Sequence, residues 1–392
     1  MTTQRRSSTW ILGVCVLTAL SAAPRAAAAQ DDEVRREFDV RSGNRLELDL
    51  RSGGTITVAG WDREVVAVDA YRSGADCADV RIDFAQDAAG VRVESYTERR
   101  SRDTHCDLRL DIRVPRRFDI EFETMGGDVA LSGVEGDLRG STMGGALELT
   151  RLRGALDLTT MGGNITLTDS EVDGKVHTMG GEVRIEDVVG DVKGTSMGGN
   201  VRYSRVTGRP GPAGTAAKSN GDEVRIHTMG GQIHVDAAPA GADVETMGGD
   251  ISIRSASDHV KARTMGGRIE IGAVDGWIEA TTMGGDVTAR MTGDPAVGDR
   301  HVSLTSMGGD VTLIVPAGLS MQVDITLAYT RDSDRDYRII SDFPLGQEET
   351  EEWEYEHGTP RKYIYGTGNI AGGRHRIRIE TVNGNVYLRR AP

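Results

Sequence analysis

Acidic and amide side chains recur just after a Met-Gly-Gly triplet, in the spacing that comes nearest to a metal site in this chain. They occupy the third position after Met in seven of ten copies: Asp128, Asn164, Glu182, Asn200, Asp250, Asp286 and Asp310. Ca²⁺ takes about six to eight oxygen ligands, so a row of such oxygens could bind it. Ala146, Gln232 and Arg268 interrupt the row, however. We therefore interpret these residues as solvated strand starts and predict no metal and no cofactor.

Other residues with catalytic or ligating chemistry do not form a recognisable set. His177 and His227 each stand two residues before a Met-Gly-Gly triplet but in different copies, so we expect them to be exposed, outward residues rather than a metal pair. Residues 366–372 are glycine-rich but lack the lysine and following helix of a phosphate loop. Neither a Ser/His/Asp set nor paired carboxylates can be defended from spacing. We expect no catalytic residue and no enzymatic activity.

The methionines of the triplets are the third candidate, as an interaction surface. They are Met125, Met143, Met161, Met179, Met197, Met229, Met247, Met265, Met283 and Met307. If the chain bends at each Met, the side chains fill a corner of the core, and this is the interpretation we favour. If the preceding strand runs straight on, the same residues form an exposed apolar stripe, which often marks an interaction site.

The spacing of these triplets predicts the elements that carry them. Successive methionines are 18 residues apart, except for two gaps of 32 and 24 residues. A constant period with loop-sized insertions is typical of a solenoid, in which each copy forms one coil. We place the insertions at residues 208–222 and near 292–300. Deleting either loop should leave the fold stable.

Within each coil, apolar residues alternate with polar ones in two short runs, as in Leu147/Leu149 and Leu156/Leu158. Alternation with period two indicates strands with one buried face. We predict an all-β, single-stranded β-helix of 18-residue coils with β-rich terminal caps. Crossovers between parallel strands are normally right-handed, so we expect a right-handed coil. Glycine suits the repeated corner because it tolerates positive φ.

The beginning of the chain is typical of a secretory signal peptide. Arg5 and Arg6 precede an apolar stretch at residues 10–20, and three alanines end at Ala29. That stretch is shorter than the roughly 20 residues that a membrane-spanning helix needs, and we expect no transmembrane span in the mature chain. Export to the periplasm, cell surface or extracellular space follows. Cleavage after Ala29 removes three arginines and changes the net charge from −14 to −17.

We divide the chain into four segments. Residues 1–29 are the signal peptide, 30–123 an N-terminal β region and cap, 124–315 the Met-Gly-Gly repeats, and 316–392 a C-terminal β cap with an acidic loop. Residues 51–58 and 376–388 look like divergent copies of the repeat at its two ends. Solenoids need atypical end coils because exposed strand edges recruit other strands.

Two cysteines, Cys77 and Cys106, remain after cleavage of the signal peptide. A pair of cysteines in an exported protein usually forms a disulfide, and we predict that bond. The alternative is a pair of buried free thiols.

Several stretches resemble the bacterial "putative adhesin" β-strand-repeat family, which is related to head-GIN auto-transporter adhesin domains. They are residues 110–115 leading into 122–129, residues 309–316, and residues 366–368 followed by 381–386. The resemblance extends from about residue 40 to the end of the chain. It implies an exported single-stranded β-helix with no established catalytic activity. The uniform Met is a departure, because the corner in that family carries varied small or aliphatic residues.

These observations favour a non-catalytic, exported surface or envelope protein that acts as an adhesin or binding scaffold. Its acidic charge argues against nucleic acid, which attracts basic patches. The partner is unknown from sequence; a cell-surface glycan or protein is the expected kind. Two alternatives are a polysaccharide-active β-helix enzyme and a self-assembling envelope scaffold. Longer coils with clustered acids would favour the enzyme, whereas unprotected ends would favour the scaffold.

Overall fold

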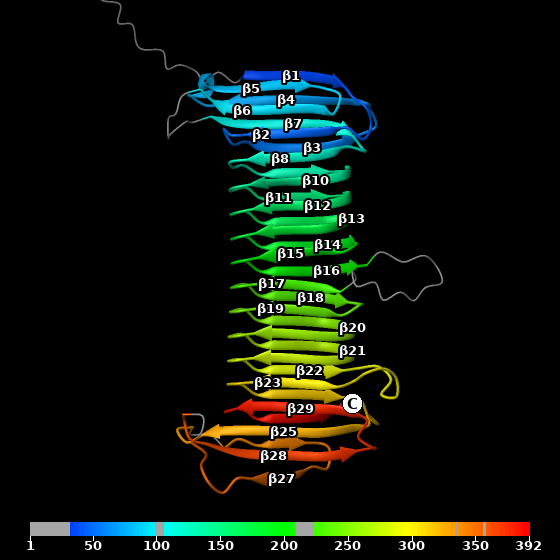
Figure 1. Ribbon diagram of the computed structural model, residues 1–392, viewed down its shortest axis with the longest axis vertical. Coiled ribbons are helices and arrows are strands. Elements are labelled where there is room, and N and C mark those ends of the chain that lie inside the picture. Colours follow the sequence, from blue (N-terminus) through cyan, green and yellow to red (C-terminus); the bar gives the residue numbers. More distant parts are fainter. Residues whose placement is uncertain (1–31, 99–105, 209–222, 334–335, 356–357) are drawn as a thin grey trace, which may run out of the picture.

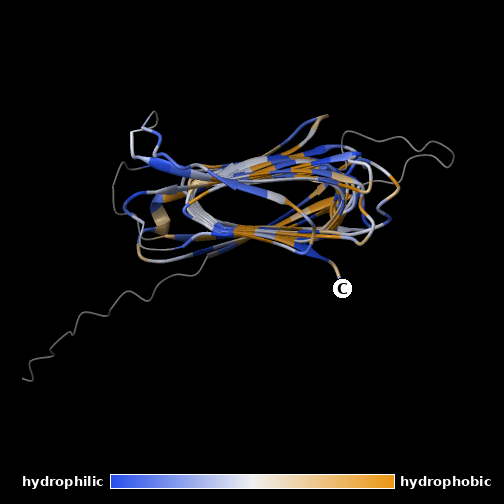
Figure 2. Cartoon of the chain, turned by 90° about the horizontal axis from the view of Figure 1, so that it is seen from below, coloured by the Kyte–Doolittle hydropathy of each residue, from blue (hydrophilic) through white to orange (hydrophobic). Residues whose placement is uncertain are grey.

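The computed structural model describes residues 32–98, 106–208, 223–333, 336–355 and 358–392. The predicted signal peptide and most of the first insertion lie outside these residues. The described chain is all-β: thirty strands form one continuous hydrogen-bonded sheet, with a single short 3-10 turn η1 (Cys77–Asp79) and no α-helix in those ranges. The sheet winds into a long column, which Figure 1 shows from the side. Seen along its axis in Figure 2, the column is a flattened ring.

The ring has two broad faces because each coil contributes one strand to each. Face A holds the strands that follow the Met-Gly-Gly triplets, together with their equivalents in the end coils: β3 (Thr55–Trp61), β9 (Val129–Ser132), β11 (Leu147–Thr150), β14 (Val183–Val189), β16 (Val201–Thr207), β18 (Ile233–Ala238), β22 (Val287–Met291), β24 (Val311–Val315) and β30 (Val386–Arg390).

Face B holds the strands that lead into the triplets, with the equivalent strands of the end coils: β2 (Arg45–Leu50), β8 (Asp119–Thr124), β10 (Glu135–Thr142), β12 (Arg153–Thr160), β15 (Val192–Ser196), β17 (Val224–Thr228), β19 (Ala242–Thr246), β23 (Val302–Ser306) and β29 (His375–Val382). Three longer strands run through both faces of their coils: β13 (Ile165–Thr178), β20 (Ile251–Thr264) and β21 (Ile269–Thr282).

Neighbouring coils pair in parallel and in register. Glu135 lies beside Arg153 and Leu147 beside Ile165, so these partners are 18 residues apart in sequence. Across the two insertions the pairing continues from Ser196 to Thr228 and from Thr282 to Ser306. Like residues therefore stack in columns along the axis at roughly 4.8 Å per rung, where a rung is one coil's level in the stack.

The core is a thin layer between the two faces. The first and third residues of β11, Leu147 and Leu149, are aliphatic and buried, and most face A strands repeat this pattern. The face B strand opposite buries Leu156 and Leu158. Each fully buried aliphatic side chain stabilises the fold by roughly 1.5–3 kcal/mol, so a coil gains its stability from a few such residues and from the pairing with its neighbours.

Both predicted divergent copies of the repeat stack as coils. Leu50 of β2 lies beside Thr124 of β8, and β3 pairs in parallel with β9. At the other end β29 and β30 pair in parallel with β23 and β24. The second insertion, predicted near residues 292–300, is the strand-free segment between β22 and β23.

Beyond the first coil, antiparallel strands close the N-terminal end. On face A the order outward from β3 is β7 (Asp107–Pro115), β4 (Val65–Ser73) and β1 (Asp32–Asp39). On face B it is β6 (Gly90–Thr97) and β5 (Val80–Gln86). The outermost strands β1 and β5 carry charged side chains, which discourage the addition of further strands.

The C-terminal end is closed in the same way. On face B, β25 (Met321–Thr330) follows β29, and β28 (Arg361–Ile370) and β27 (Gly346–Glu349) add as antiparallel strands. On face A, the short β26 (Ile339–Ser341) pairs with β30. The last strand, β27, is exposed along its whole length and carries two glutamates.

Candidate functional site

The Met-Gly-Gly corner is built around a buried hydroxyl. The residue before each Met is Thr or Ser, and it ends a face B strand with its side chain in the core. Thr160 shows the pattern: its Oγ1 donates to the carbonyl oxygen of Gly145 in the previous coil at 2.8 Å and accepts from the N–H of Gly163 at 3.2 Å. The donated bond recurs in ten successive coils, from Thr142 to Thr381, at 2.7–3.3 Å. These hydroxyls are a ladder that ties each corner to the next.

The second glycine of the triplet is required by close approach of the backbones. A Cβ atom at Gly163 or Gly249 would lie less than 3.0 Å from the carbonyl carbon and oxygen of the equivalent glycine one coil earlier. Positive φ, the reason expected from sequence, applies at Gly127 but not at these two positions. At the first glycine there is space: a Cβ atom at Gly248 would be 3.8 Å from its nearest neighbour.

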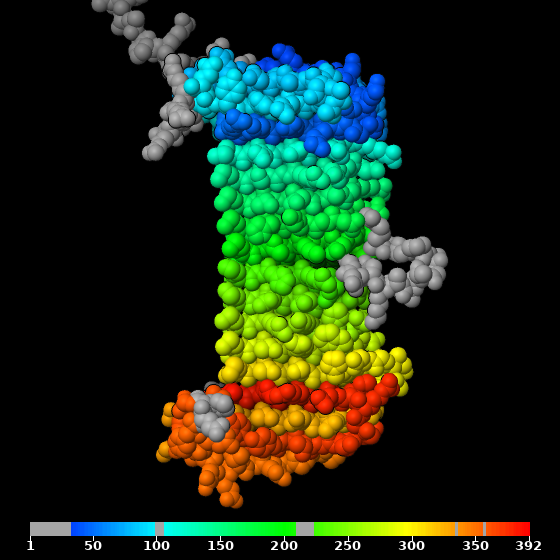
Figure 3. Space-filling view, in the orientation of Figure 1, coloured from blue at the N-terminus to red at the C-terminus, as the bar shows by residue number. Residues whose placement is uncertain are grey.

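All ten methionines of the triplets point outward, so the favoured prediction that they fill a corner of the core is wrong. Their exposed fractions run from 38% at Met197 to 59% at Met125. The physical reason is that strand alternation continues one residue past the buried hydroxyl, so Thr points inward and Met outward. We call the resulting column of ten side chains the methionine edge. In Figure 1 the face B strands β10, β12 and β15 run toward this edge of the column, and Figure 3 shows the same view of the column with its side chains filled in.

The column next to the methionine edge on face B carries mixed polar residues. Near its middle, His177, Thr195, His227 and Glu245 follow one another on successive rungs. His177 Nδ1 is 2.7 Å from Thr195 Oγ1, and His227 Nδ1 is 3.6 Å from Glu245 Oε2. With Met197, Met229 and Met247 these residues line an open hollow of about 400 Å³. The structure thus places the two histidines two rungs apart and beside the thioethers, with His227 exposed as predicted and His177 only partly exposed.

The acidic and amide residues after the triplets serve the backbone. Asp128 Oδ1 accepts from the N–H of Ala146, and Asp250 Oδ1 from that of Arg268, both at 2.8 Å. Asn164, Asn200, Asp286 and Asp310 make the same bond to the next coil. Among the residues that the structure describes, no three His, Cys, Asp or Glu side chains gather closely enough to hold a metal ion.

A second column on face B, which the sequence analysis missed, combines an acid with stacked rings. Glu223, Gly241, His259, Trp277 and His301 occupy one position on five successive rungs. The rings of His259 and Trp277 stack with centroids 4.8 Å apart, and those of Trp277 and His301 with centroids 5.3 Å apart. Both faces of the indole are covered, so this ring is not a free stacking platform. Listing the residues by coil position would have revealed this column.

The acid of this column is held ionised by its neighbours. Glu223 Oε1 is 2.7 Å from His259 Nε2, across a gap that Gly241 leaves open. Burial alone would raise the pKa of Glu223, but the hydrogen bonds from His259 and Arg225 outweigh burial and lower this pKa. His259 Nδ1 is also 3.1 Å from Asp258 Oδ2. A stabilising charge cluster explains these contacts without any nucleophile or substrate.

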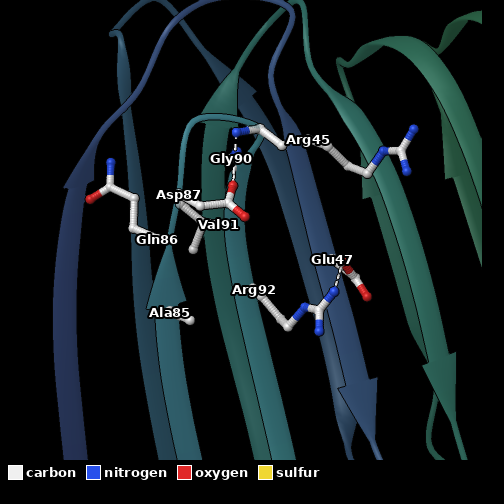
Figure 4. Close-up of a pocket in the computed structure, with 9 residues that line it drawn as sticks. Arg45, Glu47, Ala85, Gln86, Asp87, Gly90, Val91 and Arg92 are labelled. Atoms are coloured by element: carbon white, nitrogen blue, oxygen red, sulfur yellow. Dashed lines mark hydrogen bonds and ion pairs between the residues drawn. The ribbon is translucent and has the colours of Figure 1, made fainter.

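Figure 4 shows another hollow, of about 370 Å³, in the N-terminal cap. Its charged residues are engaged with each other or with the backbone. Arg92 Nη2 donates to Glu47 Oε2 at 2.8 Å, and Asp87 Oδ1 accepts from the N–H groups of Ala89 and Gly90. Arg45 turns away toward Glu121 at 2.9 Å. The hollow therefore offers no unpaired charge to a ligand.

Cys77 and Cys106 form a disulfide in the structure, with Cα atoms 4.9 Å apart. The bond joins η1 to the residue before β7, and so ties the two faces of the N-terminal cap together.

In the part of the chain that the structure describes, no helix has the length and apolar character needed to cross a membrane.

Comparison with known proteins identifies one family and several solved structures of low sequence identity. The family model described as Toastrack DUF4097 matches residues 107–389. A search of curated protein sequences gives no match. Among solved structures, a putative cell adhesion protein from Clostridium sporogenes is 9% identical, covers 92% of this chain and 100% of its own, and has a TM-score of 0.19.

Two structures from Parabacteroides distasonis are also similar. A putative adhesin is 14% identical, with 72% of this chain and 96% of its own covered and a TM-score of 0.37. A protein described as a putative lipid binding protein is 9% identical, with 72% and 90% covered and a TM-score of 0.23.

Proposed function

This chain belongs to the Toastrack DUF4097 family, as the resemblance found in its sequence implied, and we propose that it is an exported, non-catalytic binding scaffold whose methionine edge contacts an apolar surface of a partner protein. The observation that carries this proposal is the outward position of ten stacked methionines, each 38% or more exposed. Methionine is flexible and polarisable, and such side chains adapt to varied apolar surfaces. A contiguous exposed apolar stripe of this kind marks an interaction site more often than a scattered set does.

The rest of the described molecule supports a rigid scaffold. Both ends are closed by antiparallel strands, and β1 and β27 are charged, which favours a capped column over an end-to-end polymer. The disulfide of the N-terminal cap supports export, since such bonds persist in oxidising compartments. Outward acids such as Asp157, Glu171 and Glu223 form ion pairs with Lys175, Arg153 and His259. Carboxylates paired in this way with cations support a non-catalytic role. A depolymerisation screen on acidic polysaccharides should accordingly find no activity.

The proposal also includes a right-handed solenoid of 18-residue coils. The pairing of Leu147 with Ile165 and of Glu148 with Thr166 supports the coil length. The handedness rests on the general preference for right-handed crossovers between parallel strands.

The binding surface is tested by replacing Met179, Met197, Met247 and Met265 with Gln. An array of extracellular-matrix proteins, envelope proteins and glycans is probed with the wild type and with this variant. We expect the variant to lose binding to the array protein that the wild type binds. We also expect the melting temperature to change little, because exposed substitutions alter stability by only about 0.5 kcal/mol or less each.

The matched control replaces four outward face A residues, Thr166, Ser252, Thr288 and Thr312, with Gln. The control should still bind the protein that the wild type binds. Equal loss in both variants, or a wild type that binds only glycans and still binds them after the methionine substitutions, would contradict the proposal.

A further inference from the structure

One stretch of the methionine edge brings sulfur and imidazole ligands together. Met197, Met229 and Met247 lie on three successive rungs, and the N–H groups of Met229 and Met247 each donate to the carbonyl of the Met before at 3.2 Å. This pairing fixes the three Cα atoms at neighbouring rungs, roughly 4.8 Å apart. Their side chains are 38–48% exposed. Three rotatable bonds in each methionine let neighbouring thioethers turn toward one ion.

The two histidines beside these methionines present one ring nitrogen each. His177 Nδ1 is engaged by Thr195 Oγ1 at 2.7 Å, and His227 Nδ1 faces Glu245 Oε2 at 3.6 Å. Within the described part of the chain, Nε2 of neither histidine has a protein partner. A histidine that binds a metal typically uses its second nitrogen to contact a carboxylate or other oxygen, which fixes the ring orientation. At His227 the Glu245 carboxylate lies on the Nδ1 side of the ring, at ion-pair distance.

The combination is local to one part of the edge. The same hollow of about 400 Å³ is lined by Met197, Met229, Met247, His177 and His227. Elsewhere in the flanking column the described coils carry other residue types beside Met, such as Glu123 beside Met125, Thr281 beside Met283 and Thr305 beside Met307. Those rungs supply a thioether without an imidazole.

We propose that this hollow binds a soft monovalent cation, Cu(I) or its analogue Ag(I), through the thioethers of Met197, Met229 and Met247 and Nε2 of His227. Thioethers are soft ligands that select Cu(I), whereas Ca²⁺ and Mg²⁺ require oxygen. Glu245, the carboxylate of the hollow, lies 3.6 Å from Nδ1 of the same imidazole, which leaves Nε2 to the cation. His177 lies two rungs before His227 and flanks the site.

Ag(I) is the probe because it needs no reductant, so the Cys77–Cys106 disulfide stays intact and provides no thiols. The full chain is used, and every protein carries Cys15→Ser, which removes the third cysteine of the sequence. Isothermal titration of the reference protein should show one tight Ag(I) site. The triple variant Met197→Leu/Met229→Leu/Met247→Leu should weaken it by about tenfold or more, as lost coordination does.

The matched control is Met125→Leu/Met283→Leu/Met307→Leu, which removes three thioethers that have no neighbouring imidazole. It should keep the tight site. No tight site in the reference protein, or equal weakening in both triple variants, would overturn the proposal. Leucine keeps the apolar surface, so the partner-protein contact proposed above should survive in both triple variants, and the two proposals fail separately.

A second measurement uses the unsubstituted edge and so does not depend on the folding of a variant. With methionine methyl groups labelled with ¹³C, substoichiometric Ag(I) should first shift the signals of Met197, Met229 and Met247, together with the ring protons of His227. His227→Gln should weaken binding without removing the methyl shifts. Equal shifts of all ten edge methionines from the start of the titration would overturn the localised site.

Discussion

The two corners of each coil differ in what they tolerate. At the Met-Gly-Gly corner, backbones of successive coils approach so closely that the second glycine has no room for a Cβ atom. At the opposite corner, between face A and face B, Arg151, Asp169, Asp187 and Arg205 hold the same position with positive φ. Their side chains are free to pair: Arg205 and Asp187 form a two-pronged ion pair at 2.5 and 2.7 Å, and the arginine lowers the pKa of Asp187.

Both insertions leave the column at the opposite corner. The chain departs after β16 and returns at β17 around the first, and it departs after β22 and returns at β23 around the second. In Figure 1 the loop after β22 projects from the edge opposite the methionine edge. The Met-Gly-Gly corner thus enforces uniform residues because the same close approach of two glycines repeats in successive coils. The opposite corner is also hydrogen-bonded through its backbone, but its positive-φ position accepts charged residues of both signs.

The largest effect should come from adding one carbon atom to the tight corner. Gly249→Ala places a Cβ less than 3.0 Å from the backbone of Gly231 and Gln232, so the two coils must separate. We expect a loss of about 3 kcal/mol of unfolding free energy, the upper range for overpacked sites. Denaturant titration measures it, with Gly248→Ala as the control. A control that costs as much as Gly249→Ala would contradict the close-approach explanation.

The next effect should come from the hydroxyl ladder. Thr246→Val keeps the shape but removes the Oγ1 that donates to the Gly231 carbonyl at 2.9 Å and accepts from the Gly249 N–H at 3.2 Å. Two buried backbone groups then lose a partner, which should cost about 2 kcal/mol. Thr288→Val, on an outward face A position, should be nearly neutral in the same denaturant titration. Near-neutral behaviour of Thr246→Val would show that the ladder contributes little.

A smaller, pH-dependent effect should come from Glu223, which lies just after the opposite corner. Its pKa is lower in the folded protein, so its ionised form stabilises the fold above the ordinary carboxyl pKa of about 4.3. That contribution is lost as the pH falls through the folded pKa. Glu223→Gln should therefore cost about 1 kcal/mol at pH 7, and this cost should shrink as the pH is lowered from 7 toward 3. Melting temperatures across this range measure it, and Glu270→Gln, an exposed control, should show no such trend. A cost independent of pH would contradict the charge-cluster interpretation.

The smallest effect should follow removal of residues 209–222 at the opposite corner. The deletion restores an 18-residue spacing between Met197 and Met229. Loop closure depends weakly on length, so we expect a change of about 0.5 kcal/mol or less in unfolding free energy. One alanine inserted between Met247 and Gly248 is the matched change at the other corner and should destabilise far more. Equal tolerance at both corners would remove the distinction between them.

The repeated elements of this fold could be predicted from sequence because their signals recur. Alternating Leu147/Leu149 and Leu156/Leu158 predicted the strands, and the 18-residue period predicted which strands are neighbours. The antiparallel caps are less predictable, since each is built once and β1 and β5 have no second copy in the sequence.

The candidate site was predicted only in part. The sequence picked out the ten methionines, but the direction of Met depends on whether the strand bends at Thr or one residue later, which residue types do not reveal. The role of Asp128 and Asp250 as acceptors for the next coil's N–H was also hidden, because the sequence does not show where backbone groups lie. The stacking of His259, Trp277 and His301 depends on a register that continues past the second insertion.

The most direct test of the methionine edge is limited oxidation of the native protein with hydrogen peroxide, followed by peptide mass spectrometry. Exposed methionines become sulfoxides, whereas buried ones are protected. The ten edge methionines should oxidise while the protein remains folded. Met291 and Met321, which are 1% and 0% exposed, should stay unmodified until the protein unfolds and thus serve as internal controls. Protection of the edge methionines to the same degree as Met291 and Met321 would contradict the central claim that this edge is a surface open to ligands.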